Sequence, residues 1–179
     1  MKRLETKKLA LASVFCALSV VISVIGCVFD MVDLVACTGA SLIVALSRIE
    51  LRGKYPYLIY AVSGALLFLL FPSSTVTFYF ILFFGYYPII KSLLERLRTL
   101  PSYILKFTVF NTAIIIIFIL MSRLLIAEQA ESELHLLPIL WVFANIFFAV
   151  YDFSLSVFIT AYQKIYRKRL GIDKFMTSR

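Results

Sequence analysis

Charged side chains are scarce in this sequence. Asp, Glu, Lys and Arg make up 16% of the residues, hydrophobic residues make up 62%, and the mean hydropathy is +0.96. A soluble domain has about 25% charged and about 45–50% apolar residues. Too few polar side chains are present to cover a water-exposed globule. The composition therefore predicts that lipid surrounds much of the chain.

The residue patterns that usually carry enzyme chemistry are missing as well. His135 is the only histidine, and the sequence contains neither His-Glu-x-x-His nor Gly-x-Ser-x-Gly. Gly53-Lys54 lacks the upstream glycine and the following hydroxyl residue of a phosphate-binding loop. The three cysteines do not have metal-site spacing: Cys16, Cys27 and Cys37. We expect no metal, no cofactor and no enzymatic activity, with an intramembrane enzyme as the weakest alternative.

Hydrophobic runs of membrane length are abundant instead. A helix needs about 20 apolar residues to cross the hydrocarbon core. Runs such as 114–120 lack the alternation of a strand barrel, so helices are favoured. We predict an all-α membrane protein in which residues 1–179 form one six-transmembrane-helix bundle. The predicted spans are 9–29, 31–47, 55–71, 73–90, 102–122 and 136–163.

The basic residues alternate along the chain. All Lys and Arg residues except Arg123 fall before the first span, in the second or fourth connection, or after the last span. The fourth connection counted in this way includes Lys91 and Lys106. The positive-inside rule then places both termini in the cytoplasm. The net charge of +8 is accounted for by this topology, so we expect contact with membrane lipid and not with nucleic acid.

One charge, Asp152, lies deep within a predicted span. A carboxylate at membrane depth is expected to face the bundle interior and to find a partner. Counting about 1.5 Å per residue from the predicted inner ends of the last two spans puts Asn111 at the depth of Asp152. We expect Asn111 to donate a hydrogen bond to Asp152, with Tyr151 and Asn145 as further candidates. A structural link between helices is favoured over a proton or substrate site.

Small residues form one face of the first span. Ala12, Cys16, Ser19, Ser23 and Gly26 recur at spacings of three and four residues, which places them on one side of a helix. Small residues allow a neighbouring helix to approach closely in lipid. Packing inside the protein's own bundle is slightly favoured over docking to another membrane protein. Ala12, Cys16 and Ser19 are the candidate docking residues.

Polar residues gather near the predicted outer ends of the spans. Residues 73–77 are rich in hydroxyl groups, and the first loop carries two carboxylates. These side chains are candidates for a small-molecule pocket, although capping and packing would explain each of them as well. The candidate substrate-binding residues are Asp30, Asp33, Thr77, Tyr79, Trp141 and Asn145.

Residues 7–19, Lys-Lys-Leu-Ala-Leu-Ala-Ser-Val-Phe-Cys-Ala-Leu-Ser, resemble the first helix of substrate-binding S components of energy-coupling factor (ECF) vitamin transporters. Chain size, six predicted helices and cytoplasmic termini are also similar. In that family an Ala-x-x-x-Ala pattern docks on a transmembrane coupling subunit. It falls here on Ala12 and Cys16, where cysteine replaces the second alanine. No thiamine, riboflavin or biotin subfamily signature is found.

The resemblance implies a bacterial cell-membrane protein that captures a small micronutrient from outside. Its partners would be a coupling subunit and ATPase subunits that supply the energy. A rod-shape-determining cell-wall family has a similar fold. The alternative function is therefore a membrane scaffold that binds other proteins and no small solute.

The predicted topology is tested by cysteine labelling in a background without the native cysteines. Cysteines at Ser74 and Glu131 should react with an impermeant reagent from outside the cell. Cysteines at Arg52 and Arg98 should react only after the membrane is opened. Labelling of position 98 from outside would contradict the six-span arrangement.

Overall fold

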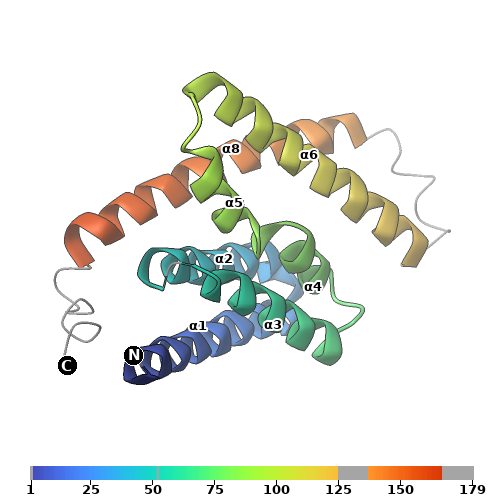
Figure 1. Ribbon diagram of the computed structural model, residues 1–179. Helices are drawn as coiled ribbons and strands as arrows, with labels where there is room; N and C mark the ends of the chain where they lie inside the picture. The colour runs from blue at the N-terminus through green and yellow to red at the C-terminus, as the bar shows by residue number, and fades with distance from the viewer. Residues whose placement is uncertain (1, 52, 125–136, 167–179) are drawn as a thin grey trace. The chain divides into compact units, whose positions relative to one another are not determined.

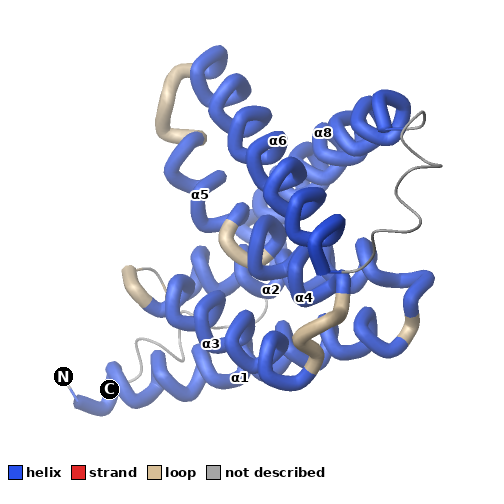
Figure 2. Tube along the Cα trace, turned by 90° about the vertical axis from the view of Figure 1, so that its right-hand side faces the viewer, coloured by secondary structure: helices blue, strands red, loops and turns tan. Residues whose placement is uncertain are grey.

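The computed structural model describes residues 2–51, 53–124 and 137–166, and every regular element among them is helical (Figure 1). Figure 2 shows the described segments as helices joined by short loops. The prediction of an all-α chain is confirmed. The elements are α1 (Lys2–Val28), η1 (Asp30–Val32), α2 (Asp33–Glu50), α3 (Tyr55–Leu70), α4 (Thr75–Tyr79), η2 (Phe80–Phe84), α5 (Tyr87–Leu94), α6 (Thr99–Leu124), α8 (Leu137–Ala161) and η4 (Tyr162–Tyr166).

Four helices are long and apolar enough to cross a membrane: Glu5–Val28, Thr75–Leu94, Thr99–Leu120 and Pro138–Ile165. The other two predicted spans correspond to shorter or more polar helices. Helix α3 is apolar but has 16 residues. Helix α2 has 18 residues and includes three charged side chains. A membrane crossing by α2 and α3 stays a prediction.

The chain divides into two compact units. Unit 1 comprises residues 1–89 and 153–179, and unit 2 comprises residues 90–152. The chain therefore passes into unit 2 after Ile89 and returns to unit 1 after Asp152. Unit 1 contains α1 to α4 and η2, whereas unit 2 contains α6, most of α5 and the first part of α8.

The small-residue face of α1 packs inside unit 1. Ser19 and Ser23 are fully buried, and Ala12 is 7% exposed. A side chain at Gly26 would have no room, because its Cβ would lie 2.5 Å from the Cβ of Ala36 on α2. This face therefore brings α1 close to its neighbours in the same chain, which is the alternative that the sequence favoured.

Contacts with α3 complete this packing. The Cys16 Sγ lies 3.3 Å from the Ser63 Oγ, and the Glu5 carboxylate accepts a hydrogen bond of 2.5 Å from the Tyr55 hydroxyl. The buried apolar cluster of unit 1 draws on α1, α2 and the residue that caps it, α3, η2 and the first turn of α5. Its members there are Ala12, Ala40, Val44, Leu51, Ile59, Leu67, Phe80 and Ile89.

The helix after α4 is irregular. Residues Phe80–Phe84 form a π-helix, in which the Gly85 amide donates to the Phe80 oxygen over 2.8 Å. The Tyr60 hydroxyl of α3 donates a hydrogen bond of 2.8 Å to the Ile81 oxygen within this segment. A Cβ at Gly85 would lie 2.6 Å from the Tyr60 ring. Glycine is therefore required for α3 to approach the irregular turn.

Tryptophan substitutions on α1 test this packing. Ala12→Trp should lower the free energy of unfolding by about 1–3 kcal/mol or more, because it overfills a packed interior. Ala17→Trp is the matched control, since Ala17 is exposed on the same helix. Thermal unfolding in detergent, followed by circular dichroism, measures both. Equal midpoints for the two variants would contradict the packing of Ala12 inside the bundle.

A buried charge network as candidate functional site

The Asp152 carboxylate lies between two lysine side chains of unit 2. Lys91 forms an ion pair with Oδ1 and donates a second hydrogen bond, of 2.9 Å, to the Asp152 main-chain oxygen. The Lys106 Nζ lies 3.1 Å from Oδ2. Lys91 is fully buried, Lys106 is 5% exposed and Asp152 is 8% exposed. Three ionised groups from α5, α6 and α8 thus meet away from water.

Glu95, just after the end of α5, completes this group. Its carboxylate lies 3.1 Å from the Lys91 Nζ and 3.3 Å from the Lys106 Nζ. We call Lys91, Glu95, Lys106 and Asp152 the charge network. Its two positive and two negative charges balance, which is needed because an uncompensated buried charge costs several kcal/mol. The Glu95 side chain is 44% exposed, so it forms the outer edge of the network.

The expected hydrogen bond between Asn111 and Asp152 is wrong. Asn111 pairs instead with Asn145, each amide donating to the other over 3.1 and 3.3 Å. Its amide also donates to the Phe107 oxygen of its own helix. Asn145, which the sequence offered as another partner of Asp152, therefore belongs to a separate amide pair between α6 and α8.

Helix register explains this correction. Lys106 precedes Asn111 by five residues on α6, and Asn145 precedes Asp152 by seven residues on α8. The helices are antiparallel, so the charge network and the amide pair lie at two levels, about 8–10 Å apart. The sequence estimate placed the start of the α6 span at residue 102, whereas α6 begins at Thr99.

Aromatic rings separate the two polar levels. The Phe148 ring stacks on Phe110 with centroids 4.3 Å apart and meets the edge of Phe107 at 5.1 Å. Phe148 lies between Asn145 and Asp152 on α8. An apolar layer beside the charges lowers the local dielectric and strengthens their attraction.

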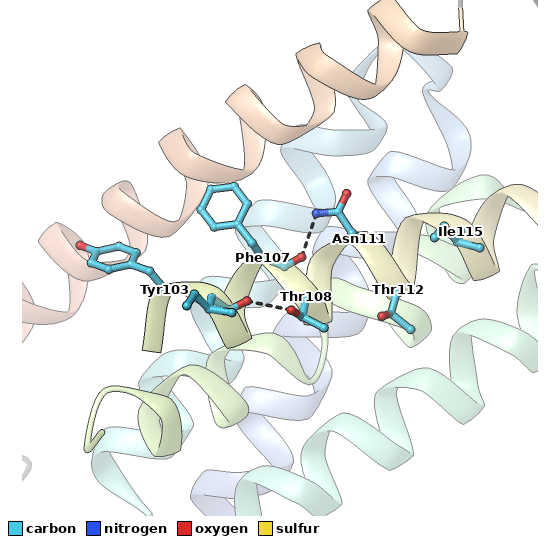
Figure 3. A pocket seen from close by; sticks show the side chains of 7 residues that line it. Tyr103, Phe107, Thr108, Asn111, Thr112 and Ile115 are labelled. Atoms are coloured by element: carbon cyan, nitrogen blue, oxygen red, sulfur yellow. Dashed lines mark hydrogen bonds between the residues drawn. The ribbon is translucent and has the colours of Figure 1, made fainter. Parts of the chain in front are cut away.

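Two open grooves lie on unit 2. The larger, about 600 Å³, runs along α6 and is lined by Tyr103, Ile104, Phe107, Thr108, Asn111, Thr112 and Ile115 (Figure 3). In Figure 3 the Asn111 amide and the Thr108 hydroxyl bond to main-chain oxygens of their own helix. These two polar groups of the groove are therefore already engaged within α6.

The second groove, about 350 Å³, is formed by α6 and α8. Its lining residues are Phe107, Trp141, Val142, Asn145, Ile146 and Ala149. It brings together Trp141 and Asn145, which are two of the predicted substrate-binding residues. Its walls are aromatic and aliphatic, which suits a small molecule that is largely apolar. The Asn145 amide at its edge is paired with Asn111 and also donates to the Trp141 oxygen, so a solute would have to share or displace these bonds.

The other predicted substrate-binding residues lie in unit 1. Thr77 is fully buried, and its hydroxyl donates to the Phe71 oxygen at the end of α3 over 2.8 Å. Thr77 is therefore used in packing and capping. Asp33 begins α2 and Tyr79 ends α4. The side chain of Asp30 and all of His135 lie outside the described part of the chain.

Sequence reasoning missed three members of the charge network. Lys91 and Lys106 were assigned to a cytoplasmic connection, and Glu95 was not considered. One signal was available, because Lys106 stands within the apolar stretch 104–107, where a solvated loop lysine is not expected. The spacing of Lys91 and Glu95, four residues apart, also places them on one helix face.

The comparisons add no family assignment: no protein-family model, curated protein or solved structure matches this chain. Within the residues that the structure describes, no group of three or more His, Cys, Asp or Glu side chains could hold a metal ion.

A double-mutant cycle tests whether the network is balanced by its own members. Asp152→Leu leaves two buried lysines with Glu95 alone, and it should lower the free energy of unfolding by about 3–5 kcal/mol. The variant Lys91→Met/Asp152→Leu keeps the Lys106–Glu95 pair, which balances itself. It should therefore be more stable than Asp152→Leu alone.

Unfolding in denaturant, measured for the wild type, both single variants and the double variant, gives the coupling free energy. If the loss in free energy of unfolding in the double variant equals the sum of the losses in the two single variants, a direct ion pair between Lys91 and Asp152 is contradicted.

Proposed function

We propose that this chain is the solute-binding subunit of an ECF-type uptake transporter in a cell membrane. It crosses the membrane six times with both ends in the cytoplasm. It binds a small micronutrient and receives its energy from a coupling subunit with ATPase subunits. The groove that contains Trp141 and Asn145 is the observation that carries this proposal.

The size and lining of this groove support solute binding. Small-molecule sites have volumes of about 300–1,000 Å³ and apolar walls with a few placed polar groups. The groove falls within this range at about 350 Å³ and combines the Trp141 and Phe107 rings with the Asn145 amide. In the proposed topology α8 begins at the outer surface, so Trp141 and Asn145 lie in the outer half of the membrane.

The distribution of basic residues supports the proposed topology even when Lys91 and Lys106 are left out of the count. Lys91 and Lys106 lie within helices and no longer count as loop residues. Arg96 and Arg98 remain between α5 and α6, so this connection keeps its positive charge. The connections thus still alternate between basic and non-basic.

Dependence on a powered partner is supported by the charge network. The sequence contains no nucleotide-binding motif. The buried charges of unit 2 neutralise one another, with both Asp152 oxygens bonded to lysines. Proton-coupled carriers use intramembrane carboxylates that take up and release the coupling proton. A carboxylate held in this way suits a subunit that does not drive transport by itself.

A membrane scaffold without a solute is the second candidate. The packed interior of unit 1, with Ser19 and Ser23 fully buried, favours it. Exposed apolar side chains on α1 would then contact other membrane helices. They include Leu9, Val14, Leu18, Val21, Ile25 and Val28.

Native mass spectrometry after purification in mild detergent distinguishes the two functions. The wild-type chain should retain a small molecule, and a membrane protein and an ATPase should co-purify with it. Trp141→Ala and Asn145→Ala should each reduce ligand retention about tenfold or more, since a few contacts dominate binding. Thr77→Ala is the control, because its hydroxyl caps α3, and it should keep the ligand.

Retention that is unchanged in Trp141→Ala and Asn145→Ala would exclude the groove as the solute site. Co-purified membrane proteins without an ATPase and without any small molecule would favour the scaffold.

A further inference from the structure

A surplus of positive charge lies at the start of α6. Arg96 and Arg98 are both exposed in the connection between α5 and α6. The carboxylates among the described residues of unit 2 are those of Glu95 and Asp152, and lysines of the charge network bind both of them. No described carboxylate of this unit is therefore left to neutralise the two arginines.

These arginines directly precede a candidate membrane span. The segment Thr99–Leu120 is long and apolar enough to cross a membrane, so Arg96 and Arg98 lie at the level of the lipid headgroups. The first helical hydrogen bond of α6 runs from the Ser102 amide to the Arg98 oxygen over 3.1 Å. The amides ahead of it form the positive end of the helix dipole. An anionic phosphate is favoured at such a place.

The groove of about 600 Å³ starts beside this charge and runs into the span (Figure 3). Its lining residues all belong to α6 and extend from Tyr103 to Ile115, a length of about 18 Å at about 1.5 Å per residue. The hydrocarbon of one leaflet is about 15 Å thick, half of the membrane core. The groove is therefore long enough for a lipid acyl chain of one leaflet.

The lining of this groove suits hydrocarbon better than a polar solute. Ile104 and Ile115 are 65% and 55% exposed, so the groove offers aliphatic surface at both ends. The Thr108 hydroxyl and the Asn111 amide donate to main-chain oxygens of α6. Polar groups that are already bonded leave little for a polar solute to recognise. Tyr103, at the end near the arginines, is of a residue type enriched at membrane surfaces.

We propose that unit 2 binds one anionic phospholipid along α6. Arg96 and Arg98 bind its phosphate, and one acyl chain lies in the groove from Tyr103 to Ile115. The positive charge selects an anionic headgroup over a zwitterionic one, and the groove fixes the position of the lipid on the helix. This inference does not depend on a solute and would hold for the scaffold function as well. Only the choice of the inner leaflet rests on the proposed topology.

Native mass spectrometry in detergent tests the site with two lipids that have identical acyl chains. The purified chain is equilibrated with equal amounts of phosphatidylglycerol, which is anionic, and phosphatidylcholine, which is zwitterionic. The wild-type chain should retain one phosphatidylglycerol molecule, with a preference of about tenfold or more, since each basic residue near a lipid surface contributes about fivefold.

Arg96→Gln/Arg98→Gln should lower this preference about tenfold or more, because it removes the charge that binds the phosphate. The matched control is Lys54→Gln/Lys164→Gln, which removes two exposed positive charges from unit 1. This control should keep the wild-type preference.

Thr112→Trp tests the acyl-chain part of the site. Thr112 is exposed and lines the groove, so a tryptophan should fill the groove without disturbing the fold. Retention of phosphatidylglycerol should fall about threefold or more, since each buried methylene of a lipid chain contributes about fourfold. Ile116→Trp is the control, because Ile116 is exposed on α6 outside the groove, and it should retain the lipid.

Equal retention of the two lipids by the wild type would overturn the site, as would a wild-type preference in the arginine variant. Unchanged retention in Thr112→Trp would overturn it as well. A dimer without lipid would do the same, because a second copy of the chain would then cover the groove.

Solute retention, read in the same spectra, should be equal in all variants. Arg96, Arg98 and Thr112 do not line the groove that contains Trp141 and Asn145. Failure of the lipid site would therefore leave the solute site standing, and the two failures are distinguishable.

Discussion

A carboxylate held between two ammonium groups is the constraint on which unit 2 depends. In a bundle made almost entirely of apolar side chains, an unbalanced charge would cost several kcal/mol. Lys91, Lys106 and Asp152 therefore have to meet, and their meeting fixes the register of α5, α6 and α8. The aromatic stack at Phe148 and the Asn111–Asn145 pair then follow along the same two helices.

Unit 1 is organised by a different principle. Residues without bulk let α1 approach its neighbours, and the close contact between Gly26 and Ala36 marks the limit of that approach. In lipid, such packing replaces the hydrophobic effect as the force between helices. Close packing of small residues thus stabilises unit 1, whereas buried ion pairs stabilise unit 2. The irregular turn at Gly85 lies just before the chain passes from one to the other.

The helical class and the small-residue face of α1 could be predicted from sequence, because both follow from local periodicity. The need of Asp152 for a partner was also predictable, since it follows from burial of a charge. The partner of Asp152 was not predictable, because pairing across helices depends on register. An error of about three residues in a helix end shifts the expected level by nearly one turn.

The groove was only partly predictable for a related reason. Trp141 and Asn145 are four residues apart and share one helix face, so sequence could group them. Thr77 looked equally suitable as a binding residue. Its hydroxyl instead satisfies the carbonyl of Phe71, a tertiary contact that periodicity does not show.

Solid-state NMR in lipid bilayers tests the central claim most directly. Dipolar recoupling between a ¹⁵N label at the Lys91 Nζ and a ¹³C label at the Asp152 Cγ reports the separation of the two charged groups in the wild-type chain. The account predicts strong coupling, which corresponds to a direct ion pair. Absence of coupling, with the Lys91 signal of an ammonium group in contact with water, would contradict a buried charge network.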